Sequence, residues 1–157
     1  MNRVSVLNLV KKCGKVLNFV NEDLRNDREI VLEAVKNEGD ALEYASDKLK
    51  NDKEIVMEAV KQYGSLLQYA SFELKNDREI VMEAVKQNGF ALYWASNELK
   101  NDREIVLKAV ETRLDALEYA PDKLKKDCDF IMSVLEVIVK QSECSILLYR
   151  MKVLLSR

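Results

Sequence analysis

Charged residues recur along this chain at a spacing that could serve ligand binding. An aspartate followed by a basic residue returns every 25 residues. The pairs are Asp27-Arg28, Asp52-Lys53, Asp77-Arg78 and Asp102-Arg103, and Asp127 continues the aspartate series. Aligned along one edge of the molecule, such a ladder could bind a charged peptide. An aspartate at the start of a helix also caps the free amides of the first turn. Local capping therefore explains each carboxylate without a ligand.

Residues suited to catalysis or metal binding are scarce. The 157 residues include no histidine, which removes Ser-His-Asp and Cys-His catalysis and His-ligated zinc. Cys13, Cys128 and Cys144 form no Cys-x-x-Cys pair, and three separated cysteines do not make a four-ligand site. Their odd number favours free thiols, and hence a cytoplasmic or otherwise reducing intracellular compartment. We expect no enzymatic activity, no cofactor and no metal.

Four aromatic residues occupy positions that are polar in the other copies of the repeat. They are Tyr63, Phe72, Phe90 and Tyr93. Aromatic side chains anchor protein interfaces through large, rigid contact areas, so we predict a partner-binding surface that includes some of these four. Tyr63 and Phe90 flank a glycine turn, which places the surface at the edge between helices. The alternative is that they pack on adjacent repeats or are ordinary exposed aromatics.

Trp94 belongs to a different series. The equivalent residues of the other units are aromatic as well: Phe19, Tyr44, Tyr69 and Tyr119. Helical spacing then predicts that Trp94 is part of the core.

The elements that position these residues are copies of one unit. The segment Asn26–Val31 returns at 51–56, 76–81 and 101–106 without insertion or deletion. A fixed period of this length is typical of repeat architectures. We divide the chain into units 1–25, 26–50, 51–75, 76–100 and 101–125 and a divergent C-terminal cap, 126–157. Together they form a single repeat domain, 1–157.

The residue pattern of each unit predicts two short helices. Asn26 and Glu29 have the spacing of a capping box. The apolar band from Ile30 to Val35 is wide enough for a helix packed on both flanks, as in a stacked array. Gly39 and its copies then suit a left-handed C-terminal cap, and a second, shorter helix follows. The pattern predicts an all-α fold, an α-solenoid of helix-turn-helix repeats.

The C-terminal region departs from this pattern. Leu114 replaces the glycine and Pro121 replaces a serine, and the chain becomes more apolar from Cys128. An apolar stripe follows at helical spacing, made of Leu147, Leu148, Met151, Leu154 and Leu155. We predict a capping helix, with self-association through this stripe or attachment to a membrane surface as alternatives. No apolar run approaches the ~20 residues of a transmembrane segment, and the first twenty residues lack the pattern of a signal peptide.

The consensus NDREIVLEAVKxxGxALxYASxxLK resembles a tandem helical repeat family catalogued as domain of unknown function 4116. The resemblance covers roughly residues 15–125 and rests on the register of the NDxE, Gly and YAS motifs. The family has no agreed activity, cofactor or catalytic residue, so it implies tandem helical repeats and no site. The resemblance also implies, as an alternative, a role as a targeting module of a secreted bacterial effector that acts inside a host cell.

For function, we expect a non-catalytic protein-protein interaction scaffold. In a repeat protein the recurring residues build the stack, and the variable positions of the central repeats are free to specify a protein partner, whose identity the sequence does not give. An RNA-binding helical repeat protein is the alternative. The near balance of 25 Lys+Arg against 27 Asp+Glu argues against nucleic acid, because nucleic-acid binders show a basic excess.

Overall fold

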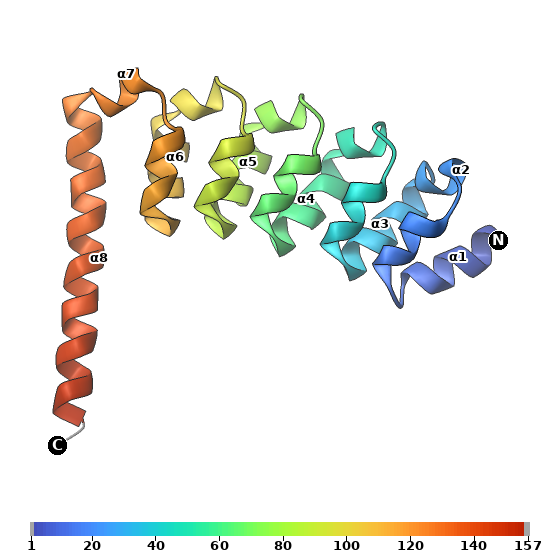
Figure 1. The fold of residues 1–157 in the computed structure, drawn as a ribbon, viewed down its shortest axis with the longest axis horizontal. Helices are drawn as coiled ribbons and strands as arrows, with labels where there is room; N and C mark the ends of the chain where they lie inside the picture. The colour runs from blue at the N-terminus through green and yellow to red at the C-terminus, as the bar shows by residue number, and fades with distance from the viewer. Residues whose placement is uncertain (1, 156–157) are drawn as a thin grey trace.

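The computed structural model describes the backbone of residues 2–155 and the side chains of residues 2–142, and this part of the chain contains helices and no strand. It confirms the all-α solenoid (Figure 1). One layer consists of α-helices: α1 (Arg3–Val10), α3 (Arg28–Asn37), α4 (Lys53–Gln62), α5 (Arg78–Gln87), α6 (Arg103–Thr112) and the long α8 (Cys128–Leu155). Consecutive helices of this layer lie side by side.

The second layer consists of six-residue 3-10 helices: η1 (Gly14–Phe19), η2 (Gly39–Tyr44), η4 (Gly64–Tyr69), η6 (Gly89–Trp94) and η8 (Leu114–Tyr119). Short helices connect the units: α2 (Glu22–Arg25), η3 (Leu49–Asn51), η5 (Leu74–Asn76), η7 (Leu99–Asn101) and α7 (Asp122–Lys125). The second helix of each unit is thus 3-10 rather than α. The tighter 3-10 winding suits such short segments.

The core confirms the prediction that each α-helix is covered on both flanks. Ile30, Val31, Ala34 and Val35 of α3 are fully buried, and so are their equivalents in α4, α5 and α6. In α8, the side chains of residues 128–142 are covered on one flank. Phe130 and Val134 are buried where α8 packs on α6, whereas Leu135, the equivalent of Val35, is 46% exposed. Within residues 128–142, α8 therefore packs on a single neighbour of its layer, as predicted for the capping helix.

The far half of α8 lies beyond what the side-chain description covers. Side chains from residue 143 onward lie outside the described residues, so self-association through the stripe from Leu147 to Leu155 stays a prediction. Within the described part of the chain, no helix is long and apolar enough to cross a membrane.

The helix cap is Asp27, which confirms local capping by the aspartate series; Asn26, which the capping-box spacing also suggested, does not cap the helix. The Asp27 carboxylate accepts hydrogen bonds from the amides of Glu29 (3.1 Å) and Ile30 (3.2 Å). Asn26 instead accepts one from the hydroxyl of Ser46 (2.8 Å), because the loop after η2 returns to the start of the same unit. The same bond joins Ser71 to Asn51 and Ser96 to Asn76.

The glycines do not serve as left-handed caps, which corrects the second local prediction. No glycine among the described residues has a positive φ. A Cβ on Gly64 would lie 2.1 Å from the carbonyl oxygen of Ala84, in the next unit, and a Cβ on Gly89 would lie 2.3 Å from that of Ala109. The glycine therefore permits the next helix to approach closely. Leu114 is 49% exposed, so no backbone fills this space in the last unit.

We expect Asp52→Ala to destabilise the fold by about 1–2 kcal/mol, because two amides at the start of α4 lose their acceptor. The matched control is Glu54→Gln, which removes only a half-exposed ion-pair partner of Arg28 and should cost less than about 0.5 kcal/mol. Urea denaturation followed by circular dichroism measures both. Equal losses in the two variants would show that the ion pair, not the cap, accounts for the stability.

Candidate functional site

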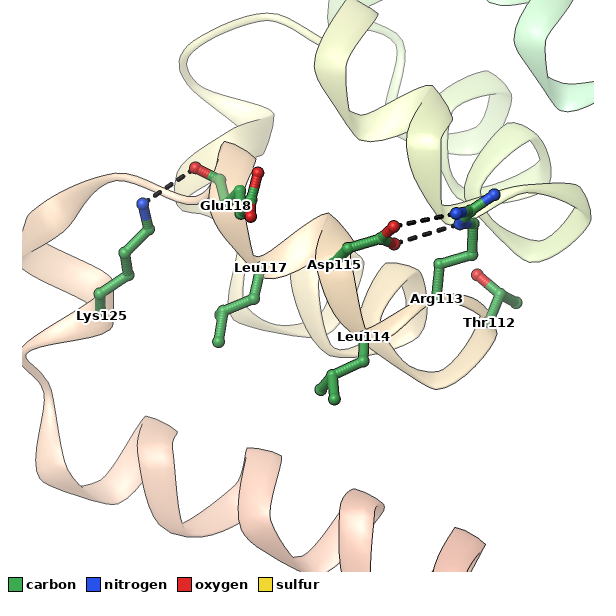
Figure 2. A pocket seen from close by; sticks show the side chains of 7 residues that line it. All are labelled: Thr112, Arg113, Leu114, Asp115, Leu117, Glu118 and Lys125. Atoms are coloured by element: carbon green, nitrogen blue, oxygen red, sulfur yellow. Dashed lines mark hydrogen bonds and ion pairs between the residues drawn. The ribbon is translucent and has the colours of Figure 1, made fainter.

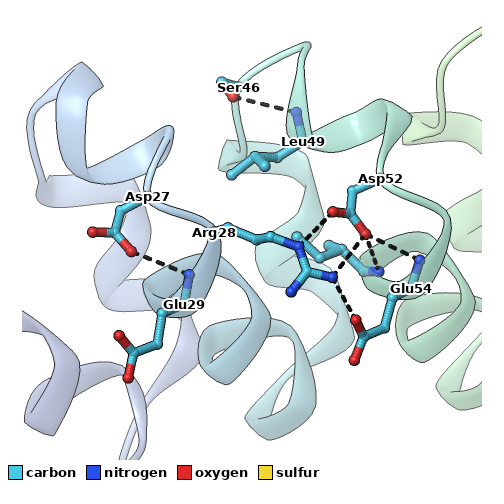
Figure 3. Close-up of polar contacts among 8 residues, drawn as sticks. Asp27, Arg28, Glu29, Ser46, Leu49, Asp52 and Glu54 are labelled. Atoms are coloured by element: carbon cyan, nitrogen blue, oxygen red, sulfur yellow. Dashed lines mark hydrogen bonds and ion pairs between the residues drawn. The ribbon is translucent and has the colours of Figure 1, made fainter.

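The charged ladder joins successive units (Figure 3). The Arg28 guanidinium donates from Nε to Asp52 (2.7 Å) and also contacts Glu54, both in the next unit. Four further basic residues make equivalent contacts: Arg3 to Asp27 and Glu29, Lys53 to Asp77 and Glu79, Arg78 to Asp102 and Glu104, and Arg103 to Asp127. Each aspartate thus caps its own helix and pairs with the preceding unit.

These contacts favour the structural interpretation of the ladder. The hydrogen bond from Arg3 lowers the pKa of Asp27 below its usual value. Burial acts to raise the pKa of Asp52, but the hydrogen bonds from Arg28 and from the Ile55 amide outweigh it and the net shift is downward. The carboxylates are therefore ionised and already bonded within the stack, so they offer little to a ligand.

The lowered pKa values predict sensitivity to acid. A carboxylate with a folded pKa below its unfolded value of ~3.9 contributes stability that is complete above that value and is lost as the pH falls through the folded pKa. The pKa values of Asp27, Asp52, Asp77 and Asp102 are all lowered, so the losses add. We expect the melting temperature to be level between pH 5 and 7 and to fall steeply below about pH 4. In Asp52→Asn the acid-induced fall should be smaller; an unchanged fall would contradict the assignment.

An amide contact between units was not predicted. Gln62, at the end of α4, donates to the carbonyl of Val35 (2.7 Å) and accepts from the amide of Gly39 (2.8 Å). Asn37 makes the same two contacts one unit earlier, to Lys11 and Gly14. These amides satisfy the helix end and the glycine turn of the preceding unit. The amide side chains of Asn37 and Gln62, 25 residues apart, were the signal in the sequence.

The structure separates the four predicted aromatics into two groups. Tyr63 (60% exposed) ends α4, and Phe72 (79% exposed) lies in the loop after η4; neither contacts another ring among residues 2–142. Phe90 and Tyr93 lie together on η6. Their ring centroids are 5.6 Å and 5.3 Å from that of Tyr119 on η8. Only Phe90 and Tyr93 therefore share one surface.

Trp94 is not part of the core, contrary to the prediction. It is 37% exposed and packs edge-on against Tyr93, with centroids 4.7 Å apart. The prediction used the α-helical period, whereas η6 has about three residues per turn. That period places Gly89, Leu92 and Ala95 on the buried face. Trp94 then lies beside the buried face and reaches solvent.

The aromatic row is the name we give to Tyr69, Trp94 and Tyr119, one per unit, together with Phe90 and Tyr93. The 3-10 helices that carry it contact one another in sequence, η4 with η6 and η6 with η8. Tyr69 lies close to the carboxylates of Glu43 and Asp40; burial and then these charges raise its pKa. Tyr69 therefore lies beside η2 of the preceding unit, and Tyr119 lies against Phe90 and Tyr93 of η6.

Three cations cover the rings. The ammonium of Lys75 is 5.7 Å from the Trp94 ring and that of Lys100 is 5.6 Å from the Tyr93 ring, while the Arg113 guanidinium is 4.2 Å from Phe90. Burial lowers the pKa of both lysines. Their stems extend the apolar surface of the row, as expected for cation–π contacts.

The central units have lost the acidic residues that flank the row elsewhere. Four positions around each 3-10 helix show this change. In unit 26–50 these positions hold Glu38, Asp40, Glu43 and Asp47, and in unit 101–125 they hold Arg113, Asp115, Glu118 and Asp122. In the two central units they hold Tyr63, Ser65, Gln68 and Phe72 (unit 51–75) and Asn88, Phe90, Tyr93 and Asn97 (unit 76–100). In the two central units, these four positions therefore carry no carboxylate. Sequence reasoning found the gained aromatics but not this loss of charge.

A cavity of about 890 Å³ lies beside η8 in the last unit (Figure 2). Its lining includes Leu114, Leu117, Asp115 and Glu118. Leu117 is only partly buried, whereas its equivalents Leu42, Leu67 and Leu92 are fully buried. The cavity is thus the place that the next 3-10 helix covers in the inner units.

Together, the two layers and the contacts between units define an α-solenoid repeat protein. Within this class, the chain belongs to the family described as Domain of unknown function (DUF4116), whose model matches residues 6–50, 27–75, 52–100, 77–125 and 102–149. The predicted resemblance is confirmed and extends into α8. No curated protein and no solved structure matches the chain.

Proposed function

We propose that this chain is a non-catalytic protein-interaction module that binds a partner on the variable positions of its central units. The observation that carries the proposal is the exposed aromatic row, centred on Tyr93 and Trp94. Half-exposed aromatics in contact with one another offer a rigid apolar surface, of the kind that anchors protein interfaces. The loss of carboxylates around the same rings removes charges that an interface would have to desolvate.

The repeat architecture supports the same proposal. Capping, ion pairing and inter-unit packing use the residues that recur, such as Asp52, Arg28 and Gly64. The row residues that change from unit to unit, Phe90 and Tyr93, are not needed for those contacts. A solenoid presents such variable positions along one extended surface.

Capture of partners from a lysate of the native cell tests the proposal. We expect Tyr93→Ser/Trp94→Ser to lose the captured proteins by roughly tenfold, as expected for interface anchors. The matched control is Tyr63→Ser/Phe72→Ser, which removes two exposed aromatics outside the row. Thermal melts verify that both variants fold.

Which variant loses its captured proteins shows whether the aromatic row is the binding surface, and what is captured shows whether the partner is a protein or a nucleic acid. Unchanged capture by the row variant, or loss in the control alone, would refute the row as the binding surface. Salt-dependent binding of a mixed RNA pool, with no protein captured, would instead favour the nucleic-acid alternative.

A further inference from the structure

Each α-helix of the stack has two flanks, and α1 shows which flank faces which neighbour. Val6 and Val10 are fully buried where α1 packs on α3 and η1. Ser5 and Leu9, on the other side of the same helix, are exposed. We name the side with Ser5 and Leu9 the preceding flank, because in α3 to α6 its equivalents face the unit before. The side with Val6 and Val10 is the following flank.

Helix α8, at the opposite end of the layer, shows the complementary arrangement (Figure 1). Phe130 and Val134, on its preceding flank, are buried where α8 packs on α6. Leu135, on its following flank, is exposed, and Ile131 beside it is only partly buried. In α3 to α6 both flanks are fully buried. Among residues 2–142, the layer thus has one open preceding flank, at α1, and one open following flank, at α8.

The open ends carry apolar side chains, whereas the terminal repeats of a solenoid that ends in water have a polar outer face. Units 26–50, 51–75 and 76–100 have no exposed large aliphatic side chain. Within residues 2–142, those that are exposed lie in α1, η8 or α8, namely Val4, Leu9, Leu114, Met132, Leu135 and Val139. Exposed apolar surface of this kind marks an interaction site.

The charged ladder is neutral at the same two ends. Within the stack, the basic residue that starts one α-helix pairs with two carboxylates of the next unit. At the position of the basic residue, α8 has Cys128. At the positions of the two carboxylates, the start of α1 has Asn2 and Val4. Contact between the two ends therefore buries no unpaired ladder charge, which would oppose association.

We propose that copies of this chain associate head to tail, with the open flank of α1 in one copy packed on the open flank of α8 in another. Leu9 of one copy then lies against Leu135 of the other. The contact continues the interface that already joins consecutive α-helices within the stack. A second copy is the partner that supplies both halves of this interface. The association is separate from the proposed function, because the aromatic row lies on the 3-10 helices.

The geometry of the contact sets the strength and form of the assembly. Only one α-helix from each copy takes part, so we expect a weak association, with a dissociation constant of about 10 µM to 1 mM. The two contacting surfaces differ, so a dimer keeps one open flank at each end and adds further copies.

Sedimentation velocity of the whole chain, from about 5 µM to 1 mM, tests the proposal. The average sedimentation coefficient should rise with concentration and pass that of a dimer. Leu9→Glu and Leu135→Glu should each raise the dissociation constant at least about tenfold, because a charge would be buried without a partner. The matched control is Phe72→Glu, at an exposed position of a central unit, which should associate as the wild type does. Thermal melts verify that the variants fold.

A mixture of the two end variants provides the decisive measurement. Leu9→Glu keeps the open flank of α8 and Leu135→Glu keeps that of α1, so an equimolar mixture should form dimers and nothing larger. Recovery of dimers also shows that each variant retains a folded, competent end.

Three results would overturn the proposal. The first is a wild-type chain that stays monomeric up to 1 mM. The second is a mixture that associates no more than its separate components. The third is association of Leu9→Glu alone as strong as that of the wild type, which would indicate a symmetric contact between two α8 helices instead.

Discussion

Replacing Gly64 by alanine should destabilise the protein by roughly 3 kcal/mol, the upper end of the usual cost of overpacking. The added Cβ would lie 2.1 Å from the carbonyl oxygen of Ala84 and 3.0 Å from its carbonyl carbon. Both atoms belong to the backbone of α5, which a side-chain rotation cannot move. The interface between two units must therefore open.

The sign of the stability change distinguishes the close contact from backbone strain, because the backbone at Gly64 lies outside the left-handed region and can accommodate alanine. Without the contact to α5, alanine at such a position stabilises by about 0.4–1 kcal/mol, since it restricts the unfolded chain. Gly39→Ala is the matched control: its Cβ would meet Leu66 Cδ1 at 2.8 Å, the end of a flexible side chain. Thermal melts of the two variants should differ clearly, and a Gly64→Ala protein as stable as the wild type would refute the close-approach role.

The sequence predicted the stack well because the stack is built from what recurs. The 25-residue period and the two-sided apolar band of α3 led directly to an α-solenoid. The ion pairs Glu58–Lys61 and Lys108–Glu111 join residues three positions apart within one helix. These features depend on residues a few positions apart, where helical geometry fixes the neighbours.

The local errors come from contacts beyond the helix in question and from the type of the second helix. Gly64 and Asn51 were assigned to local turns and caps, but the backbone of the next unit decides the role of Gly64, and the Ser71 loop of the same unit decides that of Asn51. Trp94 was assigned to the core because the second helix was taken as α rather than 3-10. Likewise, the pairing of Arg28 with Asp52 joins two units, and no spacing within a single helix could reveal it.

The candidate site was predicted only in part. Gain of an aromatic at a polar position identified Phe90 and Tyr93, but also Tyr63 and Phe72, which make no ring contact with the row. What distinguishes the first pair is contact with Tyr119 from the next unit. That contact depends on how η6 and η8 are placed side by side, and therefore on the stack as a whole.

Replacing Ile80 by alanine should cost about 2–5 kcal/mol, the usual range for a fully buried isoleucine. The equivalent deletion at the end of the stack, Phe130→Ala, removes a larger buried side chain, for which the local cost is about 3–5 kcal/mol. The two substitutions should nevertheless differ in how far their effects spread, because each unit of a solenoid contacts only its neighbours.

Ile80 lies in α5, which packs on both α4 and α6, so its loss weakens the centre of the stack and lowers the stability of every unit that depends on it. Phe130 lies where α8 packs on α6, at the end of the described stack, so its loss should release α8 and leave the inner units folded. Native-state hydrogen exchange distinguishes the two. In Phe130→Ala, the amides of α8 should lose protection while those of α4 and α5 keep it. In Ile80→Ala, protection should fall in α4, α5 and α6 together. Uniform loss of protection in Phe130→Ala would mean that α8 is required for the whole stack to fold, not only for closing its end.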